Sequence, residues 1–154
     1  MVNVRPTSVG SCHITSTDVH AKPRIDPNYL STEEDRAVAV DSLRLMRRIV
    51  MDSEAFRPYS PREVRPTADC VTQEQLVAAA AALGTTIFHP VGTANMGQGG
   101  AGDAVADSTL RVKGVRNLRV ADCSIMPNIT SGNTAAPAMV IGDNCAKFIL
   151  RSQH

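Results

Sequence analysis

The chain has 154 residues, 43% of them hydrophobic and 20% charged, a balance typical of a globular domain and not of a disordered or fibrous protein. The formal net charge is +1, with two Tyr, three Phe and no Trp. This composition excludes the basic, aromatic-rich surface that a nucleic-acid partner requires. No stretch is long and apolar enough to span a membrane, and the first ten residues lack the apolar centre of a signal peptide. We therefore expect a soluble, cytoplasmic protein.

The cysteines are scattered without a C-x-x-C pair, at positions Cys12, Cys70, Cys123 and Cys145. This spacing favours buried free thiols over disulfides. Cys12, His13 and His20 could begin a zinc site, but no second pair of residues has the spacing of metal ligands. We expect no metal.

The first part of the chain predicts a short strand and an extended connector. Residues 11–15 alternate in polarity and run into a turn cluster, which fits an edge hairpin. Residues 24–30 follow Pro23 and contain Pro27, and the residue before each proline is pushed towards extended geometry. The connector is therefore expected to be ordered but not helical.

Two amphipathic helices are expected next. Ser31 and Glu34 form an S-x-x-E capping box, and apolar residues follow at helical spacing, which predicts a helix over 32–51. Its arginines are expected to form a solvated face, at Arg36, Arg44 and Arg47. Three prolines make 56–68 a loop, after which Thr72 and Gln75 form a second capping box before an alanine-rich helix ended by Gly84.

The last third changes character. Residues 109–112 and 118–121 predict short strands that flank a turn at Gly114. A final helical face is formed by Ala138, Ile141, Cys145 and Phe148. The fold class predicted by these elements is α+β.

One glycine-rich segment imitates a dinucleotide-binding motif. Gly97, Gly99 and Gly102 satisfy G-x-G-x-x-G, and Asp122 follows at the spacing of the ribose-binding acid. That motif works only between a strand and a helix, so that the helix N-terminus meets the pyrophosphate. Neither element is predicted here, so we interpret the segment as a surface loop.

Three short motifs are informative together. They are Phe88-His-Pro-Val-Gly-Thr93, Asp122-Cys-Ser-Ile-Met-Pro127 and Ser131-Gly-Asn-Thr134. Alone, a histidine before proline is more often a packing residue than a catalyst, and an asparagine before a helix is usually an N-cap. In this order, the motifs resemble the C-terminal region of the glucose-methanol-choline (GMC) oxidoreductases, which are FAD-dependent flavoproteins that oxidise alcohols, such as choline and alcohol dehydrogenases.

The resemblance assigns roles to individual residues. It implies that His89 is the catalytic histidine and that Asn133 holds the second active-site position, which is His in some members and Asn in others. Cofactor contacts are implied for Asp122, Cys123, Asn133 and Thr134. The sequence departs from the usual pattern at Ala94 and Asn95, where a cysteine and a basic residue are more frequent.

The residue chemistry agrees with these roles. Oxidising an alcohol removes a proton from oxygen and a hydride from carbon, and imidazole is suited to accept the proton at neutral pH. The hydride acceptor must be a cofactor, here FAD. Asn133 has both donors and an acceptor, so it can hold the substrate oxygen but cannot be the base.

The resemblance also implies a domain organisation. Residues 1–97 would belong to the substrate-binding lobe, with an antiparallel sheet and helices, and residues 98–154 would return to the FAD-binding lobe as a loop, a strand and a helix. The family's N-terminal dinucleotide-binding part is absent. We therefore expect a fragment, a truncated frame or a split subunit, inactive until joined to that part or to a second chain that supplies it. The alternative is a catalytically silent module that binds a partner.

Overall fold

The computed structural model describes residues 1–97 and 104–152, which form two compact units, Met1–Thr86 and Ile87–His154. The described part contains a two-stranded antiparallel sheet and three α-helices, so the predicted α+β class is confirmed. Residues 87–97 group with the second unit. The division into lobes at residue 97 concerns a larger protein and stays a prediction.

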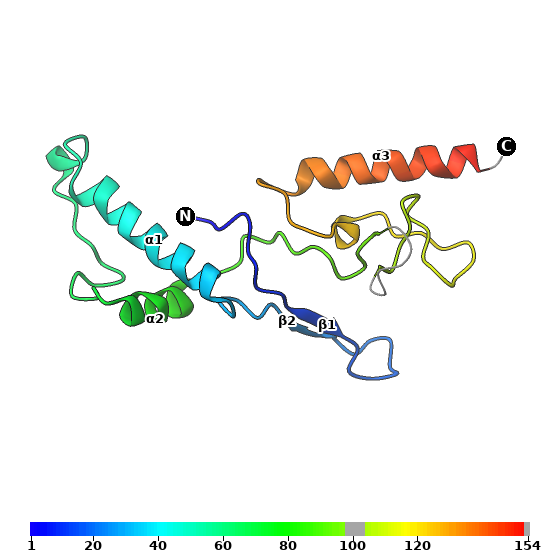
Figure 1. The fold of residues 1–154 in the computed structure, drawn as a ribbon, viewed down its shortest axis with the longest axis horizontal. Helices are drawn as coiled ribbons and strands as arrows, with labels where there is room; N and C mark the ends of the chain where they lie inside the picture. Colours follow the sequence, from blue (N-terminus) through cyan, green and yellow to red (C-terminus); the bar gives the residue numbers. More distant parts are fainter. Residues whose placement is uncertain (98–103, 153–154) are drawn as a thin grey trace. The chain divides into compact units, whose positions relative to one another are not determined.

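The predicted hairpin is present in the first unit (Figure 1). Strand β1, Ser11–His13, pairs antiparallel with β2, Arg24–Asp26, so that Cys12 lies opposite Ile25. The second strand is formed by the start of the predicted extended connector. A Cβ atom at Gly10 would lie 2.1 Å from the Asp26 carbonyl oxygen, so the hairpin closes only with glycine there.

Helix α1, Glu33–Met51, starts one residue later than its predicted capping box. Its N-cap is Thr32, whose hydroxyl accepts a hydrogen bond from the Asp35 backbone N–H at 3.2 Å. The prediction of a Ser31–Glu34 capping box is therefore wrong. The reason is tertiary, because the Ser8 hydroxyl accepts from the backbone N–H of Ser31 and holds the chain extended up to Thr32.

Asp35 ties the N-terminal segment to α1. Its side chain is 5% exposed and accepts hydrogen bonds from Asn3 Nδ2 at 3.1 Å, Thr7 N at 2.9 Å and Ser8 N at 2.8 Å. Burial by itself raises the pKa of Asp35, but the donors of Ser8 and Thr7 outweigh burial and leave the pKa below its ordinary value. The segment is thus held by a carboxylate that must stay ionised.

Acid should release this tie. Because the folded pKa of Asp35 lies below the unfolded one, its contribution is complete above the unfolded pKa of about 3.9 and is lost as pH falls through the folded pKa. The unfolding free energy, measured with urea between roughly pH 5 and 2, should fall less steeply in Asp35→Asn than in the parent. Asp41→Asn, an exposed change on the same helix, should keep the parental slope. Equal slopes for the parent and Asp35→Asn would contradict this assignment.

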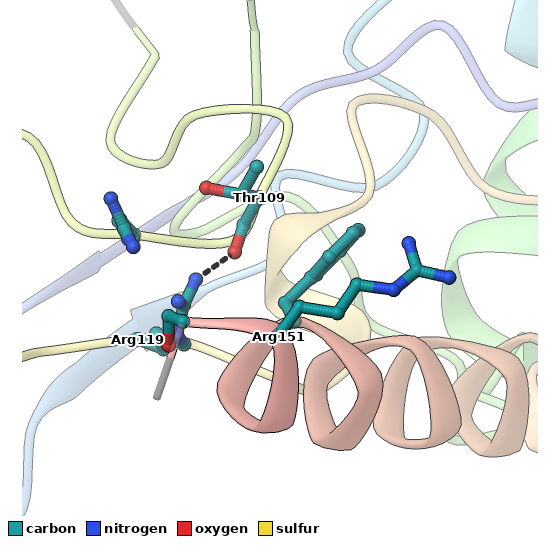
Figure 2. Close-up of a pocket in the computed structure, with 6 residues that line it drawn as sticks. Thr109, Arg119 and Arg151 are labelled. Carbon is teal, nitrogen blue, oxygen red and sulfur yellow. Dashed lines mark hydrogen bonds between the residues drawn. The ribbon is translucent and has the colours of Figure 1, made fainter. Parts of the chain in front are cut away.

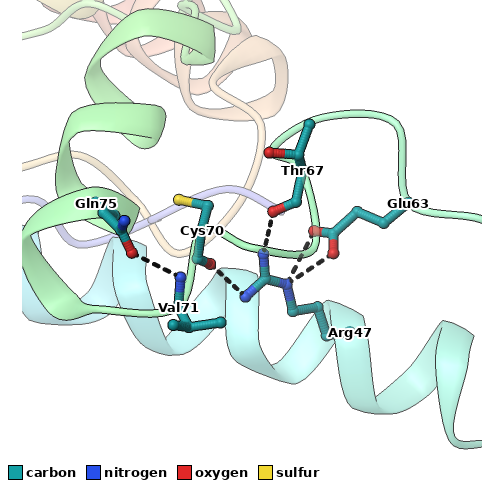
Figure 3. A network of polar contacts seen from close by, with 6 residues as sticks. All are labelled: Arg47, Glu63, Thr67, Cys70, Val71 and Gln75. Atoms are coloured by element: carbon teal, nitrogen blue, oxygen red, sulfur yellow. Dashed lines mark hydrogen bonds and ion pairs between the residues drawn. The ribbon is translucent and has the colours of Figure 1, made fainter.

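The prediction that Arg47 belongs to a solvated face is wrong. The residue is the centre of a polar network (Figure 3). Its Nε lies 2.9 Å from Glu63 Oε1, and its Nη1 donates to the Cys70 carbonyl at 2.8 Å. Its Nη2 donates to the Thr67 carbonyl at 3.2 Å. One guanidinium therefore fixes the loop before α2 onto α1. The prediction holds for Arg44, which is exposed.

Helix α2, Gln73–Leu83, has the predicted Thr72–Gln75 capping box, with both reciprocal hydrogen bonds formed. It packs against α1 (Figure 1), and the two helices contribute the buried Val40 and Leu76. The helix ends at Gly84, as predicted. The loop predicted at 56–68 contains one short 3-10 turn, η1, Arg57–Tyr59.

The second unit is built around α3, Ala135–Arg151. Its Cys145 is buried with Leu110, Ile125 and Met126, and Ile141 and Phe148 pack against them, as the predicted helical face requires. The strands predicted at 109–112 and 118–121 are wrong in extent. The two segments pair with each other only through the bridge Arg111↔Arg119, because the chain reverses within the tight turn that contains Gly114, whose φ is +76°. Val112 forms a separate bridge with Ala106.

Two further expectations concern burial and membranes. The four cysteines are free, but Cys145 alone is buried, and Cys12 is exposed because β1 is uncovered on both faces. Burial was therefore wrongly predicted for Cys12.

Across the described part of the chain, no helix has the length and apolar character needed to cross a membrane. The imitated dinucleotide motif lies largely outside the described residues.

Candidate active site

His89 lies in a segment that forms backbone hydrogen bonds with the motif of residues 122–127. Phe88 precedes it with φ at +64°, an uncommon conformation for a bulky residue. Beyond it, Ala94 N donates to the Ser124 carbonyl at 2.9 Å and Met96 N to the Ile125 carbonyl at 2.8 Å. The histidine motif and the aspartate motif, far apart in sequence, are therefore neighbours in the fold.

Asp122 begins the short 3-10 helix η2, Cys123–Ile125. Its carboxylate accepts from Ser124 N at 2.8 Å, and the Ser124 hydroxyl and N–H together hold the pKa of Asp122 below its ordinary value. The residue is exposed. It is therefore an ionised acceptor on the surface of the second unit.

Thr134 brings the third motif to the histidine. Its Oγ1 lies 3.1 Å from His89 Nδ1, and its side chain is 7% exposed. Its carbonyl oxygen accepts from Cys123 Sγ at 3.7 Å and from Ala138 N at 3.0 Å. Residues from all three motifs thus converge on Thr134.

The structure separates the predicted site residues into two groups. His89 and Cys123 both contact Thr134 and form the first group. The second group consists of two exposed residues, Asn133, which precedes Thr134 in the chain, and Asp122, at the start of η2. The contact with His89 is made by Thr134, for which the sequence predicted only a cofactor contact. A threonine at the start of a helix indicates a cap, and no sequence signal points to a histidine 45 residues away.

The N-terminus of α3 is open beside this site. Thr134 is the N-cap, but its side chain makes no capping hydrogen bond. Pro137 has no backbone N–H, so the N–H groups of the first turn belong to Ala135 and Ala136. This end of the helix therefore offers hydrogen-bond donors and a partial positive charge to an acceptor.

Two cavities of the described chain lie away from these residues. One of about 260 Å³ is lined by Thr109, Arg111, Arg119, Phe148, Arg151 and Ser152. Figure 2 shows Arg119 donating to the Thr109 carbonyl, while Arg151 extends from the end of α3. A second, of about 430 Å³, lies between α1 and residues 62–66. Neither contains a predicted site residue.

Comparisons with known proteins identify the family of the chain. Residues 6–142 match the family model of the C-terminal domain of GMC oxidoreductases. The chain therefore belongs to the GMC oxidoreductase family, which confirms the resemblance inferred from the three motifs.

Among curated relatives, the alcohol dehydrogenase [acceptor] of Pseudomonas putida is 39% identical over 95% of this chain and 26% of its own length. The oxygen-dependent choline dehydrogenase of Citrobacter koseri is 42% identical over 96% of this chain, again 26% of its own length. The structure of an FAD-dependent oxidoreductase from Chaetomium thermophilum matches this chain with a TM-score of 0.88 and 29% identity, over 97% of this chain and 26% of that protein. The chain thus spans about a quarter of these relatives.

Proposed function

We propose that this chain supplies the catalytic base and part of the flavin contacts of an FAD-dependent alcohol oxidoreductase. The observation that carries the proposal is the contact of His89 with Thr134 at the open N-terminus of α3. It sets an imidazole, which exchanges protons near neutral pH, beside donors that favour negative charge. The oxidation of an alcohol requires a base that accepts the proton, and it is favoured by donors that stabilise the negative charge left after hydride transfer.

Each residue has one role in this proposal. His89 accepts the proton of the substrate hydroxyl, while the exposed Asn133 amide donates to the substrate oxygen. When bound, FAD supplies the acceptor for the hydride, a step that no side chain can perform. Asp122, ionised and exposed, would accept hydrogen bonds from hydroxyl groups of the cofactor's ribityl chain, with Cys123 beside it.

The residues present fit one end of a flavin. The first turn of α3 presents N–H groups without a side-chain cap, which is suited to the negative charge of a reduced flavin ring. Such a helix terminus contributes about 0.3 to 1 kcal/mol when exposed, and roughly 2 kcal/mol when partly buried. This is too little to bind the whole cofactor, so the ADP half is held by an N-terminal FAD-binding part or a second chain.

The first unit belongs to the substrate side of this proposal. Residues 1–97 form most of the substrate-binding lobe, and residues 98–154 complete the FAD-binding lobe. The substrate is a small-molecule alcohol, which leaves as a carbonyl compound. Without its flavin-binding partner, the chain is inactive.

The proposal is tested by flavin content and reduction. Joined to the N-terminal FAD-binding part or second chain that holds the ADP half, the protein should show flavin absorbance that is lost anaerobically on adding choline or a primary alcohol. The chain alone should bind FAD weakly by fluorescence quenching, because a few contacts at one end must offset the cost of ordering the ligand. If the joined protein holds flavin but none of the alcohols reduces its absorbance, the chain is a catalytically silent module instead.

A further inference from the structure

Thr134 is an N-cap whose hydroxyl does not cap its helix. A threonine at this position normally accepts a hydrogen bond from a backbone N–H in the first turn, which stabilises the helix. Here the side chain makes no such bond, and its Oγ1 lies 3.1 Å from His89 Nδ1. The hydroxyl thus bonds to a histidine at the cost of the usual cap.

The geometry of the threonine is itself well fixed. Its side chain is 7% exposed, and its backbone carbonyl accepts from Ala138 N at 3.0 Å as the first bond of α3. The Cys123 thiol donates to the same carbonyl at 3.7 Å. Thr134 therefore places its oxygen at a defined point from which the imidazole ring can be oriented.

The identity of the bonded nitrogen decides what the other nitrogen can do. In a neutral imidazole, one ring nitrogen carries the proton and donates, and the other carries a lone pair and accepts. A threonine hydroxyl can donate to Nδ1 or accept from it, so the tautomer of His89 decides which of the two atoms donates. If Nδ1–H donates to the Thr134 oxygen, Nε2 holds the lone pair and can take a proton.

We propose that Thr134 is the positioning residue of His89: its Oγ1 accepts the Nδ1–H hydrogen bond, fixes the ring and leaves Nε2 as the basic nitrogen. This inference rests on the proposed function for the identity of the base, but the tautomer does not depend on catalysis. When Nε2 accepts the alcohol proton, Nδ1–H keeps the same partner, so the bond persists in both charge states. A hydroxyl also orients the ring without adding a second charge.

Nitrogen NMR tests the tautomer directly. The complete flavoprotein, labelled with ¹⁵N-histidine, is compared with His89→Gln to identify the His89 signals. At a pH where the ring is neutral, the parent should show Nδ1 protonated and Nε2 unprotonated. In Thr134→Val, which keeps the shape but loses the hydroxyl, His89 should shift towards the Nε2–H tautomer. Thr134→Ser should restore the parental pattern.

A matched control separates this effect from the loss of any nearby hydroxyl. Thr130 lies in the same loop, is exposed, and bonds through its Oγ1 to the Gly132 carbonyl at 3.3 Å. Thr130→Val should leave the His89 tautomer unchanged. A parent protein with Nε2 protonated, or a Thr134→Val variant with the parental tautomer, would overturn the proposal.

Kinetics give a second readout. In Thr134→Val, kcat for alcohol oxidation should fall roughly tenfold or more, because a misoriented base loses transition-state stabilisation. KM should stay within about twofold, since Thr134 does not touch substrate, and Thr134→Ser should recover most of kcat. A change confined to KM would overturn the positioning role. A protein that oxidises no alcohol, but whose His89 tautomer depends on Thr134, would refute the proposed function and leave the positioning intact.

Discussion

Replacing His89 by alanine in the complete flavoprotein is expected to lower kcat/KM for the alcohol by roughly 10²-fold or more, about 2.7 kcal/mol or more of transition-state stabilisation. Under the proposed function, the substitution removes the base and leaves no imidazole beside Thr134. Steady-state kinetics, with the flavin content measured by absorbance, checks this. Flavin content should stay nearly parental.

A matched histidine controls for the substitution itself. His20 lies in the exposed hairpin loop of the first unit, and His20→Ala should leave kcat/KM and flavin content at parental values. If His89→Ala lowered activity only in proportion to lost flavin, His89 would be a structural residue. Equal kinetic effects of the two alanine variants would lead to the same conclusion.

Arg47→Ala is expected to destabilise the chain by about 2 to 4 kcal/mol. The substitution leaves the Glu63 carboxylate, whose side chain is 16% exposed, without its partner and frees the carbonyls of Thr67 and Cys70. Urea denaturation, read as a shift in the midpoint at constant slope, measures the loss.

Arg44→Ala provides the comparison on the same helix. Its guanidinium is 50% exposed and lies 3.7 Å from Asp41, so its loss should change the unfolding free energy by no more than about 0.5 kcal/mol. Similar midpoints for the two variants would show that the network around Arg47 is a surface arrangement without energetic weight.

Local rules predicted the elements whose determinants are local. The Thr72–Gln75 capping box, the end of α2 at Gly84 and the buried face of α3 each depend on residues within a few positions. The start of α1 was displaced by one residue because Ser8, far back in the sequence, holds the backbone of Ser31. No pattern around Ser31 contains that information.

The same distinction applies to the site. The catalytic role of His89 stays a prediction from its motif, whereas the structure does bring the three motifs together in one unit. The partner of His89 could not be predicted, because a threonine before a helix has a local use as a cap, and the alternative use depends on a residue 45 positions away. Arg47 is a parallel case. Its hydrogen-bond partners Glu63, Thr67 and Cys70 lie in a loop, whose conformation cannot be predicted from the spacing of apolar residues.

The most direct test of the central claim is the rate constant of anaerobic flavin reduction by saturating alcohol, measured against pH by rapid mixing. The parent should show a rise with pH that reports a base, and His89→Ala should be slow throughout and lack that rise. Asn133→Ala should be slower than the parent but keep the same pH dependence, because it loses a hydrogen bond and not the base. A His89→Ala variant that reduces its flavin at the parental rate, with the parental pH profile, would contradict the account.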